Sequence, residues 1–343
     1  MGTSSDIAQR RGLERATRVM EAQGPSIGRE FARVTHAVLR DFKSDVDYQV
    51  GLLNGDGGPL EFSCSNVSDE VRYTLELGAM PPRSKVGHAH DLLVELGCPS
   101  GSEGVRERLE KLQITGTLRW GAWLGVRHAN SATSFKIYAE VPPEATIAAA
   151  ELLGRYCGPI PAVSGKRPKL VLVGQAPGSS RCEFYFELPG RELAVVDLEK
   201  LMGHVGLRER RSALAELVGS FEFRRGRCGL HDFPQAQWGF SLSLLPGGGD
   251  PVFSLIAFAR DLMGGDGLLR WQFLQGVENR GWIAGCYESL SAPLAVRDFV
   301  SGFHNMVSFT VGHAPHASIQ LSLSPPPEEL DDSPGVLKCP TQP

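Results

Sequence analysis

Alternating apolar and polar residues recur in five short segments of the chain. Each segment follows a turn and an earlier strand-like stretch, which is the pattern of the second strand of a hairpin. The five segments are residues 71–78, 135–142, 182–189, 240–246 and 319–325. Thr74 in the first segment and Ser322 in the last are 248 residues and four repeats apart, which gives a mean period of about 62 residues. A repeat of this length favours a closed or packed arrangement over a solenoid.

The alternation gives each predicted strand one apolar and one polar face. In residues 182–189, Phe184 and Phe186 share one face, and Glu183 and Tyr185 share the other. The stretches between the hairpins have apolar residues at helical spacing and read as pairs of helices. These apolar helix faces need a partner, which the apolar strand faces supply. The polar strand faces therefore point away from the helices.

Two arrangements satisfy this pattern. An open sheet would leave the ionic side chains in solvent, whereas a barrel would enclose them. About ten antiparallel strands are more than a twisted open sheet usually carries, so closure is favoured. The predicted fold is α+β, with ten antiparallel strands around a polar lumen and an outer ring of helices, in five ααββ-type repeats. We expect one domain over residues 13–325, a disordered N-terminus over 1–12 and a disordered proline-rich, acidic tail over 326–343.

Composition narrows the function classes. The 343 residues are 42% hydrophobic and 22% charged, as is ordinary for a soluble protein with a large core. A net charge of −4, from 35 basic and 39 acidic residues, lacks the basic excess that nucleic-acid binding needs. No apolar run predicts a transmembrane helix or a secretory signal, and seven scattered cysteines fit a reducing compartment. We therefore expect a cytoplasmic monomer or homodimer with no nucleic-acid or membrane partner.

Common catalytic motifs do not account for the polar faces. Residues 158–166 have glycines too far apart for a phosphate loop, and Arg167 stands where Ser or Thr is needed. His88 and His90 are two residues apart and would not share a helix face. The acidic tail has no Asp-Asp-x-x-Asp pattern, and the chain has no nucleophile elbow or dinucleotide loop. The sequence therefore predicts no metal site and carries no hydrolase or oxidoreductase signature.

Several short motifs fall in order on the predicted polar faces. Glu61 lies in Gly-Pro-Leu-Glu-Phe-Ser at residues 58–63, and Arg72 follows eleven residues later. The second and third repeats add Lys136-x-Tyr138 and Arg181-x-Glu183-x-Tyr185. Together, over about residues 27–325, these motifs resemble the aromatic prenyltransferases of the dimethylallyltryptophan synthase type, the ABBA-barrel family. In that family a Pro-x-Glu-x-Ser strand supplies a carboxylate for the indole N–H, and the next strand supplies an arginine for the diphosphate.

The resemblance implies a transferase without a cofactor. Its substrates would be an allylic diphosphate, as dimethylallyl or a longer prenyl donor, and a small aromatic acceptor such as tryptophan, joined by metal-independent electrophilic substitution. The implied catalytic residues are Glu61, Arg72 and Lys136. The implied diphosphate ligands are Arg72, Lys136, Tyr138, Arg181, Tyr185 and Gln320. The implied acceptor-binding residues are Leu52, Leu53, Glu61 and Trp123.

The residue types fit this chemistry. Converging cations stabilise the charge that develops on a leaving diphosphate. Tyrosine hydroxyls can bind phosphate, and their ring faces attract a carbocation. A carboxylate at Glu61 can accept the indole N–H and take the proton lost when the ring regains aromaticity.

The chain also departs from the family pattern. Glu183 stands where the family usually has lysine, and the last two repeats have serines where it usually has Lys, Gln or Tyr: Ser241, Ser243 and Ser322. Other cations that could contribute are Arg83, Lys85, Arg127 and His304. The cations could instead pair with carboxylates on the same faces, namely Glu76, Glu140, Glu183 and Glu187. Trp238 and Phe240 could shape an acceptor pocket or pack in the core. A phenolic, cyclic dipeptide or peptide acceptor, and a barrel that binds such a ligand without turnover, remain alternatives.

Overall fold

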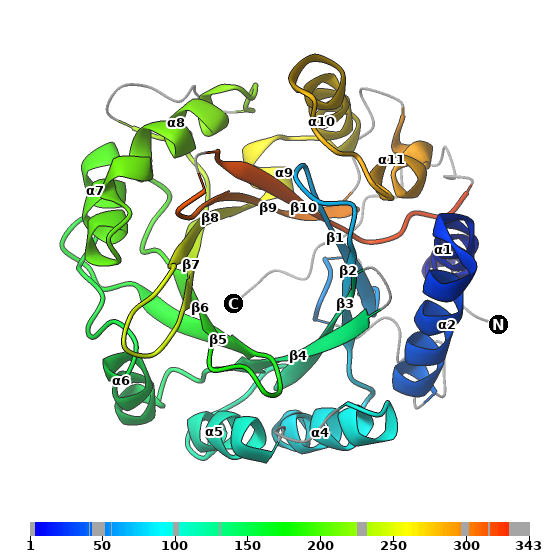
Figure 1. Cartoon of the computed structure of the whole chain (residues 1–343), viewed down its shortest axis with the longest axis horizontal. Helices are drawn as coiled ribbons and strands as arrows, with labels where there is room; N and C mark the ends of the chain where they lie inside the picture. Colours follow the sequence, from blue (N-terminus) through cyan, green and yellow to red (C-terminus); the bar gives the residue numbers. More distant parts are fainter. Residues whose placement is uncertain are drawn as a thin grey trace.

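Ten strands close into one antiparallel barrel in the computed structural model, as the sequence predicts (Figure 1). Strands that follow one another in sequence are neighbours, and β1 pairs with β10 to close the barrel, with Phe62 opposite Leu323. The strands are β1 (Leu60–Ser65), β2 (Val71–Glu76), β3 (Ala122–Ala129), β4 (Ala132–Glu140), β5 (Lys169–Gln175), β6 (Cys182–Glu187), β7 (Trp238–Leu244), β8 (Val252–Phe258), β9 (His304–Val311) and β10 (Ser318–Leu323). The structure describes residues 4–40, 42, 52–55, 57–98, 103–129, 132–224, 232–295, 302–314 and 316–328, with side chains from Arg10 onward.

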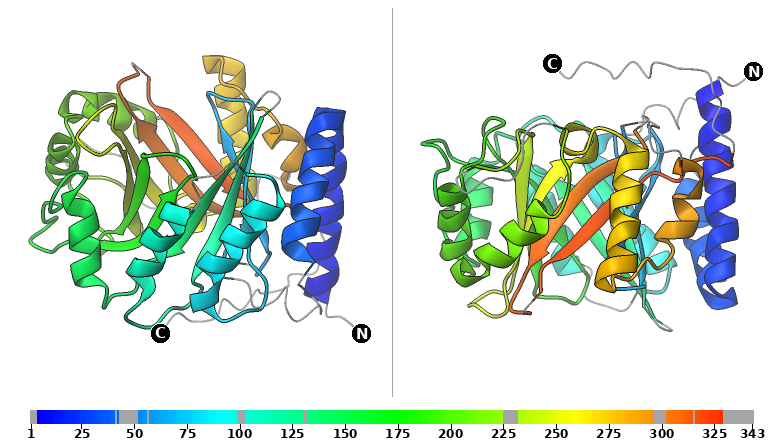
Figure 2. Two further views of the ribbon diagram at one scale, coloured as in Figure 1. Left: turned by 60° about the horizontal axis from the view of Figure 1, so that its bottom comes forward. Right: turned by 90° about the horizontal axis from the view of Figure 1, so that it is seen from above.

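Helices surround the barrel on its outside (Figures 1 and 2). They are α1 (Ser4–Gln23), α2 (Pro25–Leu39), α4 (Lys85–Glu95), α5 (Glu103–Gln113), α6 (Thr146–Gly154), α7 (Val195–His204), α8 (Arg211–Gly219), α9 (Ala259–Leu262), α10 (Asp266–Arg280) and α11 (Tyr287–Leu290), with 3-10 turns at Pro82–Ser84, Arg208–Arg210 and Ala292–Leu294. Among the described residues, no helix has both the length and the apolar character needed to cross a bilayer.

The helices do not come in pairs in every repeat. α6 alone connects β4 to β5, whereas the described part of the connection from β8 to β9 contains three helices, α9 to α11. After α6 the chain has Gly158, Pro159, Pro161 and Pro168, and prolines in helix interiors remove a backbone hydrogen bond and clash with the preceding turn. The expected second helix of the third repeat is therefore replaced by turns.

The two strand faces divide as the alternation predicts. In β6, Phe184 and Phe186 are buried while Glu183 and Tyr185 are half-buried. The apolar faces and the helices form one continuous core between the barrel and its outer ring. Phe240 belongs to this core, where it stacks on Phe186 with ring centroids 4.7 Å apart. Trp238 is also buried there and donates its indole N–H to Pro234 O at 2.8 Å. Neither residue therefore faces the lumen, and the core alternative is the correct one for both.

The two ends of the described chain pack together. α1 begins at Ser4, so residues 4–12 are helical where we expected disorder. The helix is held by α11 and by the segment that follows β10, since the Arg15 guanidinium donates to Leu290 O at 2.7 Å and to Pro326 O at 3.4 Å. Residues 325–327 are buried, whereas residues 329–343 of the expected tail lie outside the described residues. These contacts join segments 275 and 311 residues apart, which local sequence pattern does not reveal.

Candidate active site

The lumen face carries the predicted site residues at different heights. The turns within the hairpins lie at one end of the barrel, called here the hairpin end, and the connections to helices lie at the other, the helix end. Glu61 pairs with Thr74 near the helix end, and Arg72 is two residues further along β2 toward the hairpin end. Strands rise about 3.3 Å per residue, which separates the two levels by about 7 Å.

A cluster of two arginines and one carboxylate lies at the hairpin end. Arg72 and Arg127 are directly opposite each other on β2 and β3. Both donate hydrogen bonds to the Glu70 carboxylate, with Arg72 Nη2 2.5 Å from Glu70 Oε2. The hydrogen bond from Arg127, together with that from Arg72, lowers the pKa of Glu70 to about 2 against an opposing effect of partial burial. Arg72 therefore pairs with Glu70 in its own hairpin rather than with Glu76.

This cluster predicts an acid-dependent loss of stability. The pKa of Glu70 falls from its ordinary value of 4.5 to about 2 on folding, so ionised Glu70 contributes stability above about pH 4.5 that is lost as the pH falls toward 2. We expect the Glu70→Gln variant to lose less stability than the wild type between pH 5 and pH 3. Urea unfolding at a series of pH values measures this, and equal slopes for the two proteins would contradict it.

A second cluster joins β4 to β6 across β5. Lys136 contacts Glu183 at 2.5 Å, and Tyr185 donates its hydroxyl to the other oxygen of Glu183 at 2.9 Å. Burial alone would lower the pKa of Lys136, but nearby Tyr138 and Glu183 outweigh it and raise this pKa above its usual value. The ion pair that the sequence left open as an alternative is thus formed at Lys136.

Tyr138 completes this cluster because two glycines make room for its ring. The ring stands 6.0 Å from that of Tyr185 in an edge-to-face arrangement, with Lys136 Nζ 5.5 Å from the Tyr138 centroid. A Cβ atom at Gly125 or at Gly174 would lie 2.7 Å from the Tyr138 ring. The tyrosine therefore lies flat over β3 and β5, a constraint that the sequence did not reveal.

Arg181 lies just before β6 at the hairpin end. Its guanidinium donates to Ser243 O and to Asp250 O, both at 3.0 Å. Among the described residues no carboxylate lies within ion-pair distance of it. Gln320 projects from the hairpin half of β10, opposite Ser65 and Ser308. The predicted diphosphate ligands are thus spread along the lumen in separate groups. Arg72, Arg181 and Gln320 lie toward the hairpin end, whereas Tyr138 is opposite Trp123, near the helix end.

Glu61 is held at the helix end by a residue that sequence analysis missed. Asn305, the second residue of β9, donates its amide to Glu61 Oε2 at 2.7 Å. The same amide nitrogen contacts Leu53 O at 3.1 Å and Asn54 Oδ1 at 2.7 Å. Asn305 is 244 residues from Glu61 and approaches it because β10 alone separates β1 from β9. Asn305 therefore ties the Glu61 carboxylate to the loop of Leu53.

The other predicted acceptor residues meet at a buried carboxylate. Glu76 Oε2 accepts the indole N–H of Trp123 at 2.9 Å and the backbone N–H of Leu52 at 3.3 Å, while Lys85 Nζ lies 2.5 Å from Oε1. The Trp123 ring stacks on Trp120 with centroids 3.8 Å apart. All four predicted acceptor residues are thus near the helix end, opposite most of the cations.

The remaining candidate cations and carboxylates have other roles, apart from Arg127. Arg83 donates to the backbone carbonyls of residues 113, 114 and 116, and His304 is buried between Asp266 and Tyr287 at 2.7 and 3.0 Å. Glu140 accepts backbone N–H groups of residues 119–121 at 2.8–3.0 Å, and Glu187 is exposed. Among the described residues, no group of three potential ligands could hold a metal ion.

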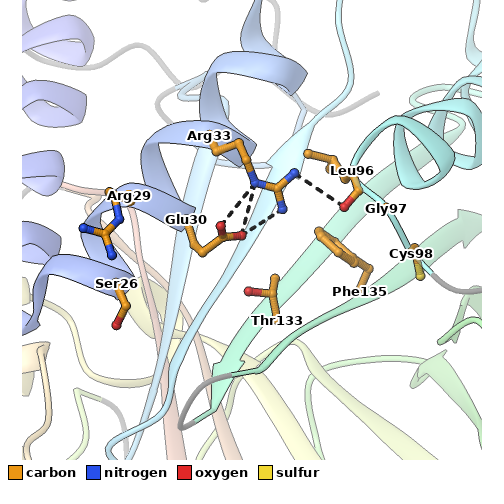
Figure 3. Close-up of a pocket in the computed structure, with 9 residues that line it drawn as sticks. All are labelled: Ser26, Arg29, Glu30, Arg33, Leu96, Gly97, Cys98, Thr133 and Phe135. Atoms are coloured by element: carbon orange, nitrogen blue, oxygen red, sulfur yellow. Dashed lines mark hydrogen bonds and ion pairs between the residues drawn. The ribbon is translucent and has the colours of Figure 1, made fainter.

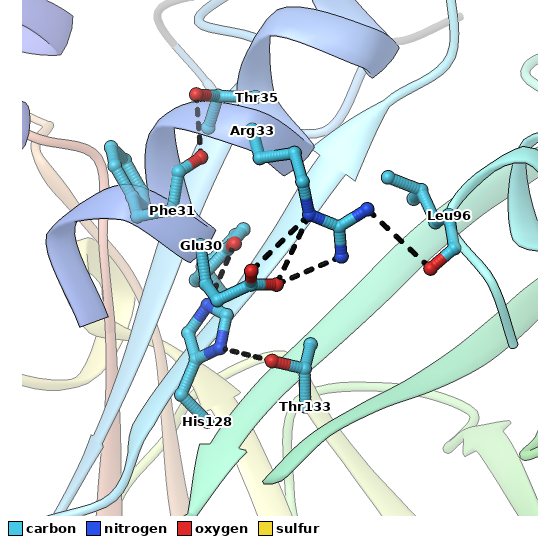
Figure 4. Close-up of polar contacts among 8 residues, drawn as sticks. Glu30, Phe31, Arg33, Thr35, Leu96, His128 and Thr133 are labelled. Carbon is cyan, nitrogen blue, oxygen red and sulfur yellow. Dashed lines mark hydrogen bonds and ion pairs between the residues drawn. The ribbon is translucent and has the colours of Figure 1, made fainter. Parts of the chain in front are cut away.

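A cavity of about 400 Å³ lies outside the barrel, between α2, the end of α4 and β4 (Figure 3). Its wall includes Arg33, which pairs with Glu30 at 2.8 Å and donates to Leu96 O at 3.4 Å. Below it, Thr133 bonds to His128 at 3.0 Å (Figure 4). None of the predicted site residues lines this cavity, so it is separate from the lumen.

Comparisons with known proteins identify the fold. No family model and no curated protein matches the sequence. Among solved structures, 6-dimethylallyltryptophan synthase from Micromonospora olivasterospora, in complex with DMASPP and Trp, matches 95% of this chain and 99% of its own at 18% identity and a TM-score of 0.71. The Streptomyces coelicolor 5-dimethylallyltryptophan synthase complex matches 97% and 100% at 16% identity and a TM-score of 0.69. NotF prenyltransferase matches 90% and 92% at 13% identity and a TM-score of 0.64. The chain therefore has the ABBA-barrel fold of the aromatic prenyltransferases, as its motifs indicate.

Proposed function

We propose that the protein is an aromatic prenyltransferase that joins a dimethylallyl or longer prenyl group to an indole-type acceptor such as tryptophan. The observation that carries this proposal is that a carboxylate and a group of arginines lie at opposite ends of the lumen. Glu61, fixed by Asn305, lies near the helix end, and Arg72, Arg127 and Arg181 lie near the hairpin end. The solved structures of the same fold that contain DMASPP and Trp support the same pair of substrates.

The first chemical step would be ionisation of the donor. The allylic C–O bond breaks and its electron pair leaves with the diphosphate, whose growing charge Arg72, Lys136 and Arg181 would stabilise. The faces of Tyr138 and Tyr185 would stabilise the allyl cation and exclude water. Arg72, Arg127 and Arg181 near the hairpin end, with Lys136 in the second cluster, are the lumen cations that would receive the diphosphate.

The second step would be attack by the acceptor ring. A C–C bond forms between the allyl cation and an aromatic carbon, and that carbon then loses its proton. Glu61 would accept the indole N–H, which increases the nucleophilicity of the ring, and would take the released proton. Tryptophan has the required N–H group, whereas a phenol, cyclic dipeptide or peptide would present a different donor to the same carboxylate.

The proposed mechanism needs no metal ion, since no aspartate-rich diphosphate motif occurs in the sequence. Incubating the purified protein with tryptophan and dimethylallyl diphosphate in EDTA, followed by mass spectrometry, tests the proposal. We expect a product heavier by one dimethylallyl group less one hydrogen. No product with any donor across a broad acceptor panel, with and without Mg²⁺, would contradict the enzyme assignment.

A second candidate is a barrel that binds an aromatic or prenylated ligand without turnover. The specific observation in its favour is the Lys136–Glu183 ion pair. Lys136 is a cation that the diphosphate would need, and it is already paired with a carboxylate. Ligand binding measured by calorimetry without any product would support this alternative.

The ion pair also leads to a prediction about donor binding. We expect Glu183→Gln to lower the KM for the prenyl diphosphate by about tenfold, because removing the like charge of a carboxylate near an anion is worth about 1–2 kcal/mol. Glu187→Gln is the matched control, since Glu187 is on the same face of β6 but exposed. Steady-state kinetics with varied donor measures both variants. An unchanged donor KM for Glu183→Gln would contradict this prediction, and a higher one would mean that Glu183 assists donor binding.

A further inference from the structure

Glu76 lies at the meeting point of three segments that are distant in sequence. It ends β2, and its side chain receives Lys85 from the start of α4, Trp123 from β3 and the backbone N–H of Leu52. The side chains of Glu76 and Lys85 are only 5% and 7% exposed. With Lys85 occupying one oxygen and two N–H donors the other, Glu76 is a support for its neighbours rather than a ligand for a substrate.

The indole of Trp123 is constrained in two directions by this arrangement. The hydrogen bond to Glu76 fixes rotation within the ring plane, and the stack on Trp120 blocks rotation out of it. Trp120 is itself anchored, because its backbone N–H donates to the buried Glu140 at 2.8 Å. Trp123 is directly opposite Tyr138 on β4, so its ring forms part of the lumen wall beside the second cluster.

The loop of Leu52 is held from both sides. Glu76 binds the Leu52 N–H at one side, and Asn305 binds Leu53 O and Asn54 Oδ1 at the other. Asn54 adds two bonds to the start of β1, to Gly58 O at 2.8 Å and Leu60 O at 2.9 Å. Hydrogen bonds from Asn305 and Glu76, together with the stack of Trp123 on Trp120, thus fix the loop and the Trp123 ring relative to Glu61.

We propose that Glu76 is a positioning residue that sets the shape of the acceptor site, through Trp123 and Leu52, without touching the acceptor. A buried ion pair contributes little net stability compared with apolar residues of similar size. Its effect at this site is geometric, since a charged acceptor of hydrogen bonds is a stronger and more directional anchor than a neutral one. The predicted change in acceptor kinetics rests on the proposed function. The predicted change in structure rests only on the contacts described above.

The test uses two variants and one control. Glu76→Gln removes the charge and leaves Lys85 unpaired, whereas Glu76→Leu with Lys85→Met replaces the pair by apolar side chains and should leave the protein folded. Asp197→Asn is the control, because Asp197 is also a buried carboxylate bound to a lysine, on the outer helix α7. In a protein labelled with ¹⁵N at the indole nitrogens, Trp123→Phe identifies the Trp123 N–H resonance.

In the double variant we expect the Trp123 indole N–H resonance to shift, the Leu52 amide to exchange faster, and the acceptor KM to rise about tenfold. The donor KM should stay within about twofold, and Asp197→Asn should change none of these. An unchanged Trp123 resonance and Leu52 exchange rate in a folded double variant would overturn the inference. The resonance and exchange measurements test the role of Glu76 even if the wild type turns over no substrate. The proposed function can therefore fail without overturning this inference.

Discussion

Replacing Glu61 by glutamine is expected to reduce turnover by about 10²–10⁴-fold, the usual contribution of a general base. Gln keeps the shape of the side chain, and its amide oxygen can still accept the Asn305 N–H, so the fold should be unaffected. The carboxylate is lost as acceptor of the indole N–H and of the ring proton. Product formation measured by chromatography and mass spectrometry, alongside thermal unfolding, checks both expectations.

The same variant separates the two chemical steps. Because Glu61 is near the helix end, away from the arginines, donor ionisation should continue and appear as slow hydrolysis to the allylic alcohol. Glu151→Gln is a suitable control, since its carboxylate is exposed and pairs with Lys111 on the outer helices. Full turnover in Glu61→Gln would remove Glu61 from the mechanism.

Replacing Arg72 by alanine is expected to reduce both transfer and donor hydrolysis by about 10²–10³-fold, as when one preorganised donor to a developing anion is removed. The reason is that Arg72 would stabilise charge on the leaving diphosphate, a requirement shared by the two reactions. Arg72→Lys should recover only part of the activity, since an ammonium ion cannot bind two oxygens side by side. Steady-state kinetics with varied donor, and inhibition by inorganic diphosphate, measure the effect.

Arg127 provides the matched control for Arg72. It is directly opposite on the neighbouring strand and binds the same carboxylate, but its side chain is 49% exposed against 34% for Arg72. We expect Arg127→Ala to reduce transfer and donor hydrolysis by less than about tenfold, because an ion pair near the solvent contributes little. A larger loss of activity in Arg127→Ala than in Arg72→Ala would indicate that the diphosphate binds closer to the solvent than proposed.

The alternation of residue types made the barrel and its lumen face predictable. Period-two patterning decides which side chains share a strand face, so Glu61, Arg72 and Lys136 could be assigned to one surface without a structure. Closure followed from the number of strands. The prolines after α6 interrupt the regularity of the repeat, which strand alternation alone does not show.

The side-chain partners could not be predicted in the same way. Asn305 reaches Glu61 because the barrel closes, and Glu183 reaches Lys136 because Gly174 leaves the space between them open. Glu76 was identified only as a possible partner for a lumen cation, whereas its contacts come from α4, β3 and a loop. Such contacts depend on strand register and tilt, which residue type alone does not determine.

The pairing of β1 with β10 has a consequence for how the protein is made. Phe62 and Leu323 are 261 residues apart, so the last seam of the barrel cannot form until nearly the whole described chain has left the ribosome. Until then β1 and the newest strand both present unpaired edges, the feature that promotes association between chains. A nascent chain truncated before β10 should therefore aggregate or recruit chaperones.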